Sequence, residues 1–141
     1  MMETKEIKIG KTEWDFSSLF SEDNESKLEE KRKIHRGKAD EFISKWKDRN
    51  DYLEKPEVLK EALDDYEAWA AEHGAFGNEY YYFHLKEFQN QTDSEVKAGF
   101  NKADEFSTKI QNDIQFFGLN IAKIKEDKQK EFLTNSGLEK Y

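Results

Sequence analysis

The chain has 141 residues, of which 38% are charged and 35% hydrophobic, and its net charge is −8. The absence of cysteine excludes disulfides, thiol catalysis and thiolate metal sites. The acidic balance argues against a nucleic-acid partner, because affinity for a phosphate backbone depends on many Lys and Arg contacts. No stretch approaches 18 apolar residues, and the N-terminus has no apolar signal region, so we expect no membrane segment and a cytoplasmic location.

Residues 1–23 form a polar arm that carries one aromatic segment, WDFSSLF at 14–20. Burial of such aromatic side chains typically holds an arm against the body of a protein. Residues 21–24 have the composition of a turn and supply candidates for a helix N-cap. We therefore expect the arm to be pinned by Trp14, Phe16 and Phe20 just before the first helix begins.

Three helices are predicted between residues 25 and 90. The first spans about 25–49, and the second begins at Pro56, which is favourable in a first turn, and stops before Gly74, a residue typical of C′ positions. After the connection at 74–77, Asn78 is expected to cap a third helix over about 79–90. Apolar positions recur at helical spacing on each of the first two: Leu28, His35, Ala39, Phe42, Ile43 and Trp46, then Leu59, Ala62, Leu63, Tyr66, Trp69, Ala70 and His73.

The fourth predicted helix is the longest, with about 33 residues and a length of roughly 50 Å. A capping box at residues 92–95 (TDSE) marks its start. One apolar stripe, in which only Ser107 is polar, runs along its whole length. Its members are Val96, Phe100, Ala103, Ser107, Ile110, Ile114, Phe117, Ile121 and Ile124. So long a stripe in so short a chain suggests packing against a larger body. A fifth helix is expected over 126–133.

Five helices with short connections predict an all-α fold, as antiparallel helical hairpins or an elongated bundle. Residues 24–141 are expected to form a single helical domain after the arm at 1–23.

The residues of this chain do not form a recognisable catalytic or metal motif. The three histidines, His35, His73 and His84, are far apart in sequence and form neither H-E-x-x-H nor a Glu-x-x-His pair. Ser107 lies on the apolar stripe, where its hydroxyl is expected to bond to the carbonyl one turn earlier. We therefore predict no catalytic residue, no metal ligand and no cofactor in this chain.

An aromatic segment at residues 80–88 is the remaining candidate for a site. Four consecutive aromatic residues surround a helix, so some must face a second partner or solvent. They can simply pack in the core, or tyrosine hydroxyls can border a groove for a peptide. On the second interpretation, the candidate substrate contacts are Tyr80, Tyr81 and His84.

Taken in chain order, several segments of the sequence resemble the N-terminal region of the M3 family of zinc metallopeptidases, and in particular its oligoendopeptidase F-like members. The matching segments are WDFSSLF at 14–20, PEVLKEALDDY at 56–66, YYFHL at 81–85 with NQTD at 90–93, FSTKI at 106–110 with NDIQFF at 112–117, and finally Leu138 and Tyr141. The ordered set covers nearly the whole chain from Trp14 onward.

The resemblance implies a mostly helical, cytoplasmic enzyme that cuts short peptides inside a deep channel. In that family the N-terminal helices form one wall of the channel, while the zinc ligands and general base lie in a later domain, on H-E-x-x-H and a downstream glutamate. This chain lacks those positions, so by itself it is not expected to be an enzyme. Its implied partners are a C-terminal catalytic domain and oligopeptides, and apolar surface is expected on the third helix, the fourth helix or near Leu138.

A second hypothesis belongs to another class. Sustained spacing of four and three residues along the fourth helix is compatible with coiled-coil pairing. The chain would then be a standalone helical module that binds partner helices through the long stripe.

Overall fold

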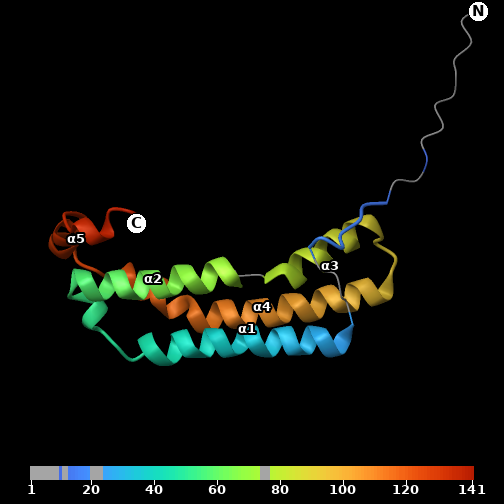
Figure 1. Cartoon of the computed structure of the whole chain (residues 1–141), viewed down its shortest axis with the longest axis horizontal. Coiled ribbons are helices and arrows are strands. Elements are labelled where there is room, and N and C mark those ends of the chain that lie inside the picture. The colour runs from blue at the N-terminus through green and yellow to red at the C-terminus, as the bar shows by residue number, and fades with distance from the viewer. Residues whose placement is uncertain (1–9, 11–12, 20–23, 74–76) are drawn as a thin grey trace, which may run out of the picture.

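The computed structural model describes residue 10 and residues 13–19, 24–73 and 77–141, and its described parts contain helices and no strand (Figure 1). The prediction of an all-α fold is confirmed. The elements are α1 (Glu25–Trp46), η1 (Asp51–Leu53), α2 (Pro56–Glu72), α3 (Gly77–Gln89), α4 (Ser94–Ile121), α5 (Glu126–Leu133) and η2 (Ser136–Leu138), where η denotes a 3-10 helix.

Helix α4 runs back along both α2 and α3, which follow one another along the same side of the molecule (Figure 1). Helix α1 packs against both α2 and α4, and α3 forms a hairpin with α4. The body is thus an elongated bundle with three helices in cross-section. Two of them are α1 and α4, and the third is α2 in one half of the molecule and α3 in the other half. The predicted antiparallel hairpins are those of α1 with α2 and of α3 with α4.

Helix boundaries follow local chemistry and differ from the predictions at several ends. The Asn24 side chain caps α1 by accepting from the Ser26 amide, and Pro56 begins α2 as expected. Helix α1 ends at Trp46 rather than Arg49, whose guanidinium instead pairs with Asp51 in η1. Helix α3 begins two residues earlier than predicted, at Gly77, so its first turn includes the expected cap, Asn78.

The long helix is shorter than predicted, with 28 residues. The capping box is wrong by one position, since the Asp93 carboxylate accepts from the amides of Glu95 and Val96 in place of Thr92. At the other end, i to i+3 bonds such as Ile124 N to Ile121 O tighten the chain into a turn before α5. Helix α5 has the predicted bounds.

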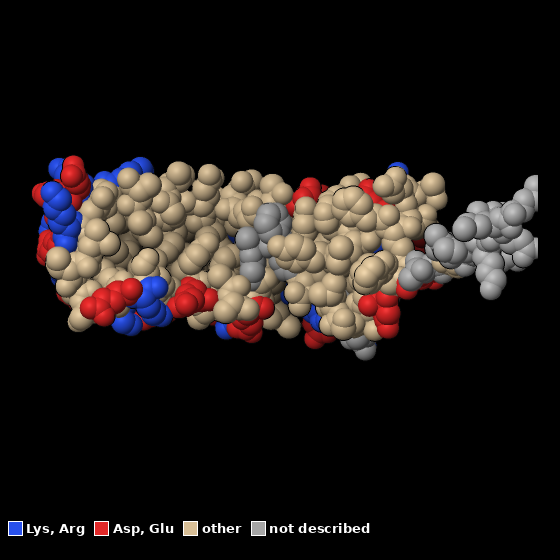
Figure 2. Space-filling view, turned by 90° about the horizontal axis from the view of Figure 1, so that it is seen from above, with Lys and Arg blue, Asp and Glu red and all other residues tan. Residues whose placement is uncertain are grey.

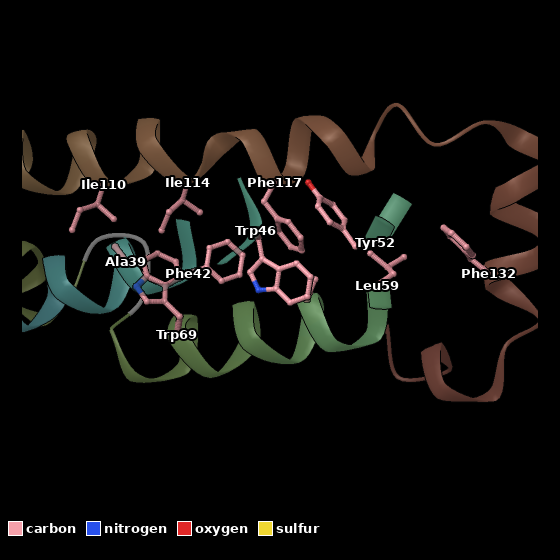
Figure 3. Packing of buried hydrophobic residues seen from close by; sticks show 11 residues of the cluster. Ala39, Phe42, Trp46, Tyr52, Leu59, Trp69, Ile110, Ile114, Phe117 and Phe132 are labelled. Atoms are coloured by element: carbon pink, nitrogen blue, oxygen red, sulfur yellow. The ribbon is translucent and has the colours of Figure 1, made fainter. Parts of the chain in front are cut away.

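The main core lies between α1, α2 and the C-terminal half of α4 (Figure 3). The Phe42 ring of α1 contacts Tyr66 of α2 and Phe117 of α4, with centroids 5.7 and 5.2 Å apart. Trp46 and Tyr52 are fully buried and pack edge to face. The Tyr52 hydroxyl accepts a hydrogen bond from Asn120, which ties η1 to the end of α4.

A smaller core joins α1, α3 and the N-terminal half of α4, and is formed by Leu28, Tyr82, Phe83 and Ala103. The stripe of α4 is therefore covered by helices of this same chain, with Ala103, Ser107, Ile110, Ile114 and Phe117 all buried. The Ser107 hydroxyl donates to the Ala103 carbonyl at 2.8 Å, as predicted. The length of α4 is explained within the chain, since α4 spans two helices placed end to end.

The aromatic segment of the arm is only partly attached to this body. Phe16 is half-buried against the smaller core, whereas Trp14 is 74% exposed. The expectation that Trp14 pins the arm is wrong, because the side chain is left in solvent. Phe20 lies outside the described residues.

Gly99 on α4 lets α3 approach closely, whereas Gly37 on α1 has open space around it. A Cβ at Gly99 would lie 2.3 Å from the buried ring of Phe83, whereas a Cβ at Gly37 would have no described atom within 4 Å other than those of its own helix backbone. We expect Gly99→Ala to lower the free energy of unfolding by about 1–3 kcal/mol through overpacking. Gly37→Ala should raise it by about 0.5–1 kcal/mol through helix propensity.

Urea denaturation followed by far-UV circular dichroism measures both changes. Equal effects of the two substitutions would contradict the close packing of α3 on α4.

Candidate functional site

The structure brings together two of the three predicted substrate-contact residues. Tyr80 and His84, one turn apart on α3, stack with centroids 5.6 Å apart, and both lie against Phe100 of α4 at 5.4 Å. Both are half-buried, and the Nδ1 atom of His84 is buried with no hydrogen-bond partner in the described part of the chain. These two side chains therefore serve the α3–α4 contact, with part of each ring at the surface.

Tyr81 lies on the exposed side of α3. Its exposed neighbours Leu85 and Phe88 follow at i+4 and i+7, so the three side chains form one apolar row along the helix. Tyr82 and Phe83 are buried on the opposite side. The expectation that the aromatic run surrounds the helix is confirmed, and the row lies on one of the helices predicted to carry apolar surface.

A groove runs between α2 and the C-terminal half of α4, on the side that α1 does not cover. Its volume is about 600 Å³. Tyr66 and Phe117, with centroids 5.4 Å apart, join its two walls. Its lining is Leu63, Tyr66, Trp69, Gln111, Asn112, Ile114, Gln115, Phe117, Gly118, Leu119 and Ile121.

None of these lining residues is charged, although Asp, Glu, Lys and Arg make up 38% of the chain. Figure 2, seen from the side of α2 and α3, shows a broad surface without charged residues, which gather at its edges. Asp113, within the same segment of α4, pairs with Arg36 of α1 instead. On α2, Asp65 accepts from Lys45 and from the Trp46 indole, and Asp64 pairs with Lys60 and Lys140. These three carboxylates are thus paired with groups other than those that line the groove.

Two histidines meet where α2 ends, beside the Trp69 indole. The rings of His35 and His73 stack with centroids 4.9 Å apart, and His35 also contacts Trp69 and Phe106. The Nε2 atoms of both histidines and the Trp69 Nε1 are buried and have no hydrogen-bond partner among the residues that the structure describes. Burial, with the nearby His73, lowers the pKa of His35 to about 4. His35 is therefore neutral at pH 7, and the aromatic contacts are those of a structural group.

The basic run at residues 31–38 is used partly for packing between helices. The Arg32 guanidinium binds both carboxylate oxygens of Glu79 on α3, and both side chains are largely buried. This carboxylate raises the pKa of Arg32. Arg36 pairs with Asp40 and with Asp113 of α4. The Arg32–Glu79 and Arg36–Asp113 pairs link α1 to α3 and α4, whereas Arg36–Asp40 lies within α1.

Within the described residues, no three His, Asp or Glu side chains converge in a way that could hold a metal ion. Among the same residues, no helix has the length and apolarity needed to cross a bilayer. The groove and the exposed row on α3 both present uncharged surface.

The groove was not predicted from the sequence, although a signal for it is present there. Residues 111–122 (QNDIQFFGLNIA) contain one charged residue in a heavily charged chain. The periodicity of the stripe accounts for Ile114 and Phe117 as core, but not for this depletion of charge on the outer side. Uncharged Gln111, Asn112, Gln115 and Leu119 at helical spacing beside the stripe indicate a second contact surface.

Comparison with known proteins does not extend these observations: no protein-family model, no curated protein and no solved structure matches the chain.

Proposed function

We propose that this chain is a non-catalytic helical domain of an M3-like, oligoendopeptidase F-type zinc metallopeptidase, and that it forms one wall of the channel for oligopeptide substrates. The observation that carries the proposal is the uncharged groove between α2 and α4. A face of this kind suits contact with another protein surface, because charged residues are depleted at the centres of interfaces.

The aromatic residues of α3 give the wall its proposed contact with peptide. Tyr80 and His84 present part of their stacked rings, and Tyr81 is exposed beside them. Aromatic side chains supply large contact area with few rotatable bonds, so they suit peptides of varied sequence. In this proposal zinc and the catalytic groups belong to the rest of the cytoplasmic enzyme.

The alternative, a standalone module that pairs through the stripe of α4, has less support. The central members of the stripe are buried against α1, α2 and α3. Such a module would have to use another surface, and the groove is then the best candidate.

The proposal can be tested by co-expressing this chain with the zinc-binding remainder of an oligoendopeptidase F-type enzyme that lacks its own N-terminal helices. We expect the two chains to copurify and to cleave a quenched fluorescent peptide. Tyr81→Ala, with Trp14→Ala as the control at another exposed aromatic residue, should raise KM with little change in kcat, because the lost contact binds substrate and transition state alike.

Two results would contradict the proposal. One is zinc-dependent cleavage of the peptide by the purified chain alone. The other is a failure of the two chains to copurify when each is well folded.

A further inference from the structure

We infer that the groove between α2 and α4 is the docking site of one amphipathic helix from a partner, about three turns long, with an apolar stripe and basic flanks. The source of the partner helix rests on the proposed function, in which this helix belongs to the remainder of the enzyme. Its chemistry is argued from the groove itself.

The walls of the groove favour a helix over an extended peptide. Both walls are α-helices, whose backbone N–H and C=O groups are bonded within the helix, so no sheet edge is offered to an added strand. An extended segment would bury many of its backbone groups against apolar residues such as Leu63, Phe117 and Leu119, and the few side-chain amides of the lining could pair with only some of them, which is costly. A helix satisfies its backbone internally and buries only side chains.

The arrangement of helices also leaves room for one more. Helices α2 and α4 both pack on α1 and meet each other through Tyr66 and Phe117. A helix laid over this contact would complete a four-helix bundle. The lining of α4 extends from Gln111 to Ile121, which is roughly 15 Å, or about three helical turns.

The uncharged lining of the groove and the net negative charge of the chain indicate which residues the partner helix should carry. With no charged residue lining the groove, a charge on the buried stripe of the partner would be left unpaired, so that stripe must be apolar or neutral. The amides of Asn112 and Gln115 can bond to neutral polar groups beside the stripe. Because the chain carries a net charge of −8, Lys or Arg on the outer flanks of the partner helix would favour its approach.

Leu119 and Ile34 provide a matched pair of variants for the test. Leu119 lines the groove and is 53% exposed, whereas Ile34 lies on α1 outside the groove and is 54% exposed. Leu119→Glu and Ile34→Glu make the same change in charge at similar exposure, so non-specific attraction to a basic peptide changes equally in both. Thermal unfolding of each variant verifies that it is folded.

The probe is a fluorescently labelled synthetic peptide of about 14 residues, with leucines on one helical face and lysines on the other. At physiological ionic strength, fluorescence anisotropy should show saturable binding to the wild-type chain. Leu119→Glu should weaken this binding by at least about tenfold, since it places a charge against the apolar stripe, and Ile34→Glu by less than about twofold. Amide shifts in NMR spectra should change along residues 111–121 and 63–69.

Equal binding by the two variants, or no saturable binding, would overturn the inference. Shifts confined to Tyr81, Leu85 and Phe88 would overturn it in favour of the row on α3. A dimer in sedimentation that Leu119→Glu dissociates would make a second copy of the chain the occupant. The peptide assay does not involve the catalytic remainder of the enzyme. The peptide can therefore bind when copurification fails, and copurification can succeed when the peptide does not bind.

Discussion

Replacing Trp46 by alanine is expected to lower the free energy of unfolding by about 3–5 kcal/mol, the largest stability effect we expect from a single side chain here. Trp46 is completely buried at the centre of the main core. Its ring packs against Tyr52 and under the Arg49 guanidinium, and its indole N–H donates to Asp65 at 2.9 Å. Alanine leaves a cavity where α1, η1 and α2 meet, and it removes the hydrogen bond.

Urea denaturation of the variant, followed by circular dichroism, measures the loss. Trp46→Phe should cost less than half as much, because a ring still fills most of the space. Trp14→Ala is the matched control and should change stability by no more than about 0.5 kcal/mol, since its side chain is exposed. A loss below about 1 kcal/mol for Trp46→Ala would show that this side chain is not at the centre of the core.

Acid should destabilise the fold through His35. Its pKa is about 4 in the folded chain and near 6.5 when unfolded, so the unfolded chain binds the proton more readily. The stability that neutral His35 contributes is complete above about pH 6.5 and is lost as the pH falls toward 4. The full loss from this residue is about 3 kcal/mol.

The neighbouring charged groups do not remove this effect. His73 stacks on the ring, Glu72 lies 3.8 Å from His73, and Lys31, Arg32 and Glu79 line the adjacent cavity. Comparison with His35→Phe, which cannot titrate, cancels the contribution of the carboxylates. Between pH 7 and pH 4, the variant should lose about 3 kcal/mol less stability than the wild type. Parallel pH profiles for the two proteins would show that His35 is not buried in its neutral form.

The periodicity of apolar residues was sufficient to identify the helices, because the residues on the buried face of a helix recur about every 3.6 positions in the sequence. The buried positions Leu28, Ala39, Phe42 and Trp46 of α1 are those that the pattern marked. Within the predicted elements themselves, the errors lay at helix ends and in the arm, where one side chain decides the outcome. The Asp93 carboxylate caps α4 in place of the Thr92 hydroxyl, and Trp14 remains exposed while Phe16 packs.

By itself, then, the sequence determined the all-α class, the order of the helices and the faces that they bury. Only the tertiary structure decided that α1, α2 and α3 cover the stripe of α4. It also decided that the rings of Tyr80 and His84 contact Phe100 while Tyr81 faces solvent. It also revealed the groove, which needs Leu63 and Leu119 from helices far apart in the chain. The physical reason is that helical spacing specifies which side chains share a face, whereas the partner of that face depends on how the helices pack together.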